Sequence, residues 1–246
     1  MPVFFVPANC IVPPNVSITG SLLRHVRDSL RLHVDETILI GDDMGRRYRV
    51  RIAAATKQEL TGRILEPIEP PARATPTLAL GQALLKGDKM DWVIQKATEL
   101  GVRSIHPLQT RQSIVQPKAE RVHNQVTRWQ RIALEAAQQS EQWTVPTVAM
   151  PQLFTTYCST GHKSLRMILT ERRHGVASFD DVALPTTAEM SVELLVGPEG
   201  GWTQEEVTTA EQAGFRAITL GQTILRAETA AIAAVAILQQ KLGALG

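Results

Sequence analysis

The hydrophobic positions of the chain change their spacing near residue 77. Before residue 70, apolar residues alternate with polar ones or form short runs, which is typical of strands. The pattern predicts a hairpin and one further strand, at residues 37–40, 46–53 and 59–65. Residues 21–32 differ, because Leu22, Val26 and Leu30 recur at helical spacing. This part of the chain is therefore predicted to be mostly β.

From residue 77 onwards, short apolar runs alternate with longer amphipathic stretches. The short runs predict strands at 77–83, 102–108, 167–171, 192–196 and 217–220. The amphipathic stretches predict helices at 88–100, 117–141, 203–214 and from 226 onwards. This alternation indicates an α/β domain whose parallel sheet is covered on both faces. The proline-rich stretch 66–76 separates the two patterns, so we predict domains at 1–70 and 77–246.

Two glycine-rich turns each connect a predicted strand to a predicted helix. The first is Gly197-Pro198-Glu199-Gly200-Gly201-Trp202, followed by Thr203 and Glu206 at the spacing of a capping box. The second begins at Gly221. Ligands of open α/β sheets bind beyond the carboxyl ends of strands, where glycines let the backbone approach them closely. Neither turn has a P-loop or dinucleotide fingerprint. Two such turns in series favour a ligand site, although a lone Gly-Gly pair can simply make a tight turn.

Composition and charge narrow the classes of protein to which the chain can belong. The 246 residues are 43% hydrophobic and 20% charged, with a net charge of +2, so nucleic-acid binding would need local clusters of charge. Cys10 and Cys158 are far apart, and no secretion signal follows Met1, which fits a cytoplasmic protein without a disulfide framework. No apolar run is long enough to predict a membrane span, and the six histidines lack metal-ligand spacing.

Arginines cluster locally on the second strand of the predicted hairpin. Arg47, Arg49 and Arg51 alternate with Tyr48 and Val50, so their side chains are expected on one face of the strand. Arginine forks match phosphate oxygens, which makes a phosphate-contacting stripe one interpretation. A solvated face balanced by nearby acidic residues explains the pattern equally well.

Four motifs in the second domain carry a family resemblance when they are taken in order. They span Leu85–Val102, Arg128–Ser140, Leu195–Trp202 and Leu220–Ala230. Over about 150 residues they resemble the α/β-knot (SPOUT) methyltransferases, and most closely the RsmE family, which methylates N3 of a uridine in 16S ribosomal RNA. The first 70 residues resemble that family's PUA-like small β-barrel. The chain departs from the family pattern at Pro2-Val3, where an arginine is usual, and at Arg24-His25, where two histidines are common.

The resemblance implies a C-terminal trefoil-knot domain, a homodimer and an S-adenosylmethionine site made by the knotted loops. The cofactor contacts that it implies are Thr170, Glu171, Val196, Gly197, Pro198, Glu199, Gly200, Gly201, Leu220, Gly221, Ile224 and Leu225. The implied partner is 16S ribosomal RNA or the small ribosomal subunit. The residues expected to bind that RNA are Arg24, His25, Arg27, Arg31, Arg47, Arg49, Arg51, Lys86 and Lys89.

The implied reaction needs a positioned acceptor and a route for the uracil N3 proton. Arg226 and Glu228 follow the second glycine turn, so we expect Arg226 to stabilise negative charge on a uracil carbonyl and Glu228 to take the proton. An intersubunit or capping ion pair explains these two residues nearly as well. Glu199 is a third candidate, but its position inside a tight turn suits holding the loop.

Three other functions are alternatives to this one. Methyl transfer to a ribose 2′-OH would use the same fold and cofactor, but the residues at 226 and 228 argue against it. A non-catalytic RNA-binding protein would explain the barrel and its arginines but not the paired glycine turns. A nicotinamide-dependent oxidoreductase is disfavoured by the missing fingerprint.

Overall fold

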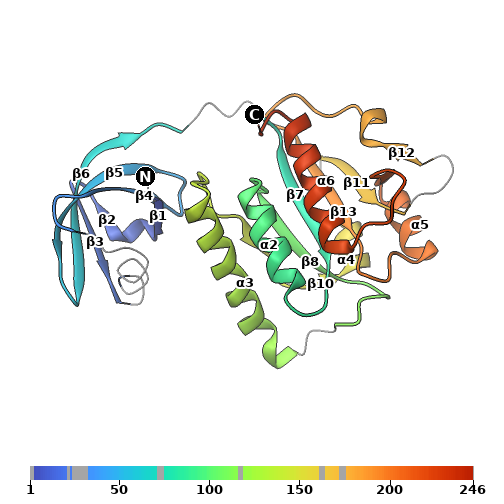
Figure 1. Ribbon diagram of the computed structural model, residues 1–246, viewed down its shortest axis with the longest axis horizontal. Helices are drawn as coiled ribbons and strands as arrows, with labels where there is room; N and C mark the ends of the chain where they lie inside the picture. The colour runs from blue at the N-terminus through green and yellow to red at the C-terminus, as the bar shows by residue number, and fades with distance from the viewer. Residues whose placement is uncertain are drawn as a thin grey trace. The chain divides into compact units, whose positions relative to one another are not determined.

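The computed structural model describes residues 3–20, 23, 33–70, 75–115, 119–160, 164–171 and 176–245 (Figure 1). The chain divides into two compact units. The first consists of Met1–Arg73 together with Ala137–Val145, and the second of Ala74–Ala136 together with Pro146–Gly246. The division after Arg73 falls in the proline-rich stretch. The sequence pattern does not predict that residues 137–145 belong to the first unit.

The first unit is built on a six-stranded sheet with the strand order β1-β4-β5-β6-β3-β2. Its strands are β1 (Val3–Val6), β2 (Ile11–Val12), β3 (Asn15–Thr19), β4 (Thr37–Asp42), β5 (Arg47–Ala55) and β6 (Glu59–Ile68). β1 pairs with β4 in parallel, and the other pairings are antiparallel. Alternate residues such as Ile38, Ile40, Val50 and Ile52 fill its core. The mostly β prediction is confirmed, whereas the predicted helix 21–32 lies outside the described residues except for Leu23, which is helical and buried.

The second unit is built on an eight-stranded sheet in which all pairings between described strands are parallel. The order is β10-β8-β7-β13-β11-β14-β12, with β9 also paired to β8. The strands are β7 (Thr77–Ala83), β8 (Ser104–Gln109), β9 (Thr147–Val148), β10 (Gln152–Leu153), β11 (Ser164–Leu169), β12 (Ala177–Ser178), β13 (Ser191–Val196) and β14 (Arg216–Thr219). The five predicted strands are present with ends shifted by up to three residues.

Helices cover both faces of this sheet. They are α2 (Lys89–Glu99), α3 (Ala119–Gln139), α4 (Phe154–Ser159), α5 (Gln204–Gln212) and α6 (Ala227–Lys241). Leu195 of β13 packs with residues of α4 and α5, while α6 lies beside α2 and contacts β7 and β13 (Figure 1). Successive residues of a strand face opposite sides, so Val192, Leu194 and Val196 of β13 share one face, while Leu195 shares the other with Glu193, which is buried in an ion pair with Arg166 (3.2 Å). In the described part of the chain, no helix has the length and apolarity needed to cross a membrane.

Local signals set the helix ends as the sequence predicts. Thr203 Oγ1 accepts a hydrogen bond from the N–H of Glu206 (3.2 Å), and Glu206 Oε2 accepts one from the N–H of Thr203 (2.9 Å). This capping box fixes the start of α5. Gly101 and Gly214, with φ of +80° and +87°, follow the ends of α2 and α5. Asp88 stands at the N-cap of α2, but its side chain makes no capping bond there.

Candidate ligand pocket at the strand ends

The loops that leave β11, β13 and β14 surround a pocket of about 480 Å³. All twelve residues predicted to contact a cofactor line this pocket. Thr170 and Glu171 follow β11, Gly197–Gly201 follow β13, and Leu220–Leu225 follow β14. The structure therefore brings together three segments that are far apart in the sequence. Gln222 and Thr223, inside the predicted segment Leu220–Leu225, also line the pocket, as do Trp202 and Ala230, which sequence reasoning did not assign to it.

Trp202 holds the first glycine loop against the end of β11. Its Nε1 donates a hydrogen bond to the carbonyl oxygen of Leu169 (2.9 Å), and its ring packs on Phe154 with centroids 5.0 Å apart. A Cβ atom on Gly197 would lie 3.1 Å from Nε1, so the ring occupies the space that a side chain at 197 would need. Gly201 has φ of +74°, which a side chain would disfavour. The indole thus explains the glycine at 197, whereas the positive φ explains the glycine at 201.

The second glycine loop packs much less tightly. Gly221 has φ of +131°, and residues 221–226 are all exposed. Ile224 is 83% exposed although it is large and apolar. Ile224 lines the pocket, so a molecule bound there would cover this apolar side chain. This loop forms the open side of the pocket.

Arg226 and Glu228 stand at the start of α6. Arg226 is the N-cap residue, is exposed and lines the pocket, whereas Glu228 is only 8% exposed. Within the described chain the two side chains form no ion pair with each other. The Oε2 atom of Glu228 lacks a hydrogen-bond partner there, although Lys89 Nζ lies 3.4 Å away. A carboxylate in the first turn of a helix is favoured by the helix dipole, and this one keeps accepting capacity.

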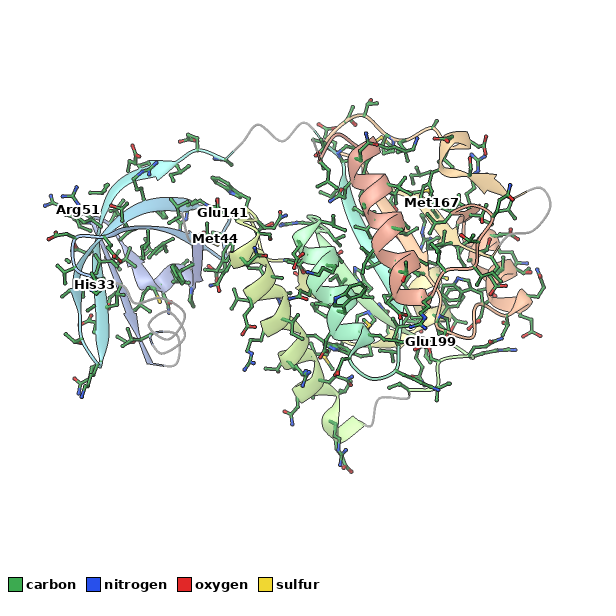
Figure 2. All side chains as sticks on the ribbon, in the orientation of Figure 1. His33, Met44, Arg51, Glu141, Met167 and Glu199 are labelled. Carbon is green, nitrogen blue, oxygen red and sulfur yellow. The ribbon has the colours of Figure 1, made fainter. Side chains whose placement is uncertain are left out.

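Glu199 fastens the first glycine loop to the start of α2 (Figure 2). Its Oε1 accepts hydrogen bonds from the backbone N–H of Lys86 and from Lys89 Nζ, both at 3.2 Å. Burial raises the pKa of Glu199, but bonds from its own backbone N–H, Lys86 and Lys89 outweigh burial and lower that pKa below its usual value. The hydrogen bond with Glu199 in turn raises the pKa of Lys89. Both groups therefore stay charged near neutral pH.

Of the residues predicted to bind RNA in the second unit, Lys89 lines the pocket and Lys86 is exposed beside it. In the first unit, Arg24, His25, Arg27 and Arg31 lie outside the described residues. Arg49 is partly exposed and bonds Glu66 (2.7 Å), and Arg51 is exposed (Figure 2).

Arg47 fits neither a phosphate-contacting stripe nor a solvated face, because it is only 7% exposed, so its prediction as an RNA-binding residue is wrong. Its guanidinium lies 4.3 Å from the centroid of the Trp143 ring and donates to the carbonyl oxygen of Gln142 (2.5 Å). Trp143 Nε1 in turn donates to the carbonyl oxygen of Gly45 (2.9 Å). Burial lowers the pKa of Arg47. The segment 137–145 covers this arginine, which the periodicity of β5 cannot reveal.

Over the described ranges, no group of three His, Cys, Asp or Glu side chains is placed to hold a metal ion. The charged groups at the pocket are instead Lys89, Glu171, Glu199 and Arg226, with Glu228 next to it. The pocket is thus built from backbone-rich loops and a few ionic side chains. Such a site suits an organic ligand with hydrogen-bonding edges.

Family comparisons match both units. A family described as RNA methyltransferase domain matches residues 73–239, and one described as RNA methyltransferase PUA domain matches residues 18–65. Ribosomal RNA small subunit methyltransferase E of Synechocystis is 31% identical over 231 residues, covering 92% of this chain and 73% of the relative. The protein of the same name from Bacillus subtilis is 26% identical, covering 90% of this chain and 88% of that relative.

Solved structures agree with these matches. Ribosomal RNA small subunit methyltransferase E from Neisseria gonorrhoeae, bound to S-adenosyl methionine, superimposes with a TM-score of 0.87 at 33% identity and 98% coverage of both chains. A methyltransferase from Legionella pneumophila, in complex with the bound cofactor SAM, gives 0.86 at 27% identity and 97% coverage of both. The predicted fold class, an α/β trefoil-knot domain after a PUA-like β-barrel, is confirmed.

We predict that Trp202→Phe lowers the free energy of unfolding by roughly 0.5–1.5 kcal/mol, because the Leu169 carbonyl loses its indole donor while the aromatic packing remains. Urea unfolding followed by circular dichroism measures this difference. Trp92→Phe is the matched control, since Trp92 is 47% exposed and its side chain makes no hydrogen bond within the described chain. Equal stability losses in the two variants would show that the indole hydrogen bond does not hold the loop.

Proposed function

This chain belongs to the ribosomal RNA small subunit methyltransferase E family, and we propose that it methylates N3 of a uridine in 16S ribosomal RNA with S-adenosylmethionine as methyl donor. One observation carries the proposal. Twelve residues predicted from sequence to hold the donor converge on one pocket, and Arg226 stands in its wall with Glu228 two residues further on. The relatives from Neisseria and Legionella, each with this donor bound, support the assignment.

The pocket fits the proposed donor by size and by chemistry. Its volume of about 480 Å³ lies within the ~300–1,000 Å³ that small-molecule sites enclose. Backbone groups of the two glycine loops suit the edges of an adenine, and the exposed carboxylate of Glu171 suits the hydroxyls of a ribose. When bound, S-adenosylmethionine supplies a methyl group on a positively charged sulfur. Glu171 and Glu199 place negative charge in the same wall.

The residues proposed to act on the uracil acceptor lie at the start of α6. The uracil has to leave its base stack so that its N3 edge reaches the pocket. Glu228 accepts the N3 proton, and the freed nitrogen electron pair forms the new bond to the methyl carbon as the sulfur–carbon bond breaks. Arg226 donates hydrogen bonds to a uracil carbonyl oxygen, where negative charge grows. Holding these groups in place contributes most of the rate, since orientation alone can supply up to ~7–11 kcal/mol.

Ala230→Leu tests the donor site. Ala230 lines the pocket from the first turns of α6, so a leucine there occupies space that the donor needs without straining the backbone. We expect S-adenosylmethionine to bind about 10–100-fold more weakly, as an overpacking cost of ~1–3 kcal/mol implies. Isothermal titration calorimetry measures the affinity, with Thr229→Leu, exposed and outside the pocket, as the control. Unchanged affinity in a folded Ala230→Leu protein would place the donor elsewhere.

Arg226→Ala and Glu228→Gln test the acceptor side. Arg226→Ala should lower the rate of methyl transfer about 10²–10³-fold, as the loss of a transition-state donor does, while the affinity for S-adenosylmethionine changes little. Glu228→Gln keeps the shape but removes the base, so its activity should rise with pH as uridine N3 loses its proton more readily. Incorporation of labelled methyl into 16S ribosomal RNA measures both rates. Equal losses of rate and donor affinity in Arg226→Ala would show that Arg226 binds the donor instead of acting on the uracil.

The first unit is proposed to bind the RNA. Arg49 and Arg51 remain as candidates for phosphate contacts, whereas Arg47 is buried. A double Arg49→Ala, Arg51→Ala variant should reduce the log–log salt dependence of RNA binding by roughly 0.7–0.9 for each phosphate that is no longer neutralised. Filter binding at several salt concentrations measures this slope, with Lys57→Ala, exposed at the tip of the β5–β6 hairpin, as the control. An unchanged slope would mean that these arginines are only solvated.

The active protein is further proposed to be a cytoplasmic homodimer. α6 presents many alanines, and small side chains on a helix allow close packing across a two-fold axis. Static light scattering at micromolar concentration should give the mass of two chains. The mass of a single chain at every concentration would contradict the dimer.

A further inference from the structure

Lys89 lies between two carboxylates that come from different parts of the fold. Its Nζ is 3.2 Å from Oε1 of Glu199 in the first glycine loop and 3.4 Å from Oε2 of Glu228 in the first turn of α6. Lys89 itself belongs to the first turn of α2 and lines the pocket. One ammonium group therefore links three elements that surround the pocket.

The two carboxylates depend on Lys89 to different degrees. Glu199 also accepts a hydrogen bond from the backbone N–H of Lys86. Glu228 is nearly buried, and its Oε2 makes no hydrogen bond within the described chain. Lys89 is the only cation among the described residues within ion-pair distance of Glu228. The other ionisable groups of the pocket wall, Glu171 and Arg226, form no ion pair with any of these three residues there.

The exposure of the two side chains separates a structural role of Lys89 from a chemical one. The Lys89 side chain is 35% exposed, and ion pairs with so much solvent access add little to stability. The same pair matters more to Glu228, because Lys89 is the one charged partner that the described residues offer this nearly buried carboxylate. Removing the ammonium would also leave Glu199 and Glu228 as neighbouring like charges. The ammonium therefore matters more for the position of Glu228 than for the fold.

We propose that Lys89 is a positioning residue for the methyl transfer, whose ammonium holds the Glu228 carboxylate in place beside the acceptor. This inference rests on the proposed function, because it requires Glu228 to take the N3 proton. It gives Lys89 a role different from the RNA contact that the family resemblance implies. It also explains why a lysine at the start of α2 turns towards the pocket.

The experiment compares kcat and the affinity for S-adenosylmethionine in Lys89→Met, Lys89→Arg and wild type, with labelled methyl transfer to saturating 16S ribosomal RNA. Without the cation, Glu228 loses the charged partner that holds it, so kcat should fall about 10–100-fold in Lys89→Met while the donor affinity changes little. Lys89→Arg restores the charge and should restore kcat. Lys96→Met, two turns along α2 and paired with Glu99, should leave kcat and donor affinity unchanged.

Two results would overturn the proposal. The first is an unchanged kcat in Lys89→Met together with weaker RNA binding and a salt slope reduced by roughly 0.7–0.9, which would make Lys89 a phosphate contact. The second is a loss of kcat that Lys89→Arg fails to restore. Where Lys89→Met does not fold, Lys89→Gln takes its place in the same comparison. A wild type that methylates no ribosomal RNA would overturn the proposed function and this inference together, whereas the first two results leave the proposed function standing.

Discussion

The position of β11 between β13 and β14 is the constraint on which the pocket depends. Leu169, the last residue of β11, pairs with Val196 on one side and with Ile218 on the other. All three strands run in the same direction, so their following loops start at the same level of the sheet. The N–H of Thr170 continues the ladder by donating to the carbonyl oxygen of Ile218 (2.9 Å). A shift of one residue in either register would turn the loops away from each other.

The loops around the pocket differ in how firmly they are held. The first is attached to β11 by Trp202, to α5 by the capping box and to the start of α2 by Glu199. The loop after β14 is exposed from residue 221 to residue 226 and has few such attachments. The side of the pocket formed by the first loop is therefore held by more contacts than the side formed by the second. Lys89 connects the first loop to α6, which carries the groups proposed to act on the acceptor.

Sequence reasoning succeeds here where the signal is local. The strand 77–83, the Thr203–Glu206 capping box and the two glycine loops are each written in a few consecutive residues, and the structure has them. β9, β10 and β12 contain two residues each, too few to show a periodicity. The burial of Arg47 by Trp143 and the ion pairs of Lys89 join residues about 95 to 140 positions apart, so no spacing rule reveals them. The twelve pocket residues were predicted as one site from the family resemblance and not from the local pattern.

The central claim is that the pocket serves methyl transfer to uridine N3, and the identity of the product tests it most directly. Small ribosomal subunits or 16S ribosomal RNA that lack the modification would be incubated with the protein and S-adenosylmethionine, digested to nucleosides and analysed by mass spectrometry against methylated standards. The account predicts 3-methyluridine as the new nucleoside. A methyl group on ribose, or on a base other than uracil, would contradict it.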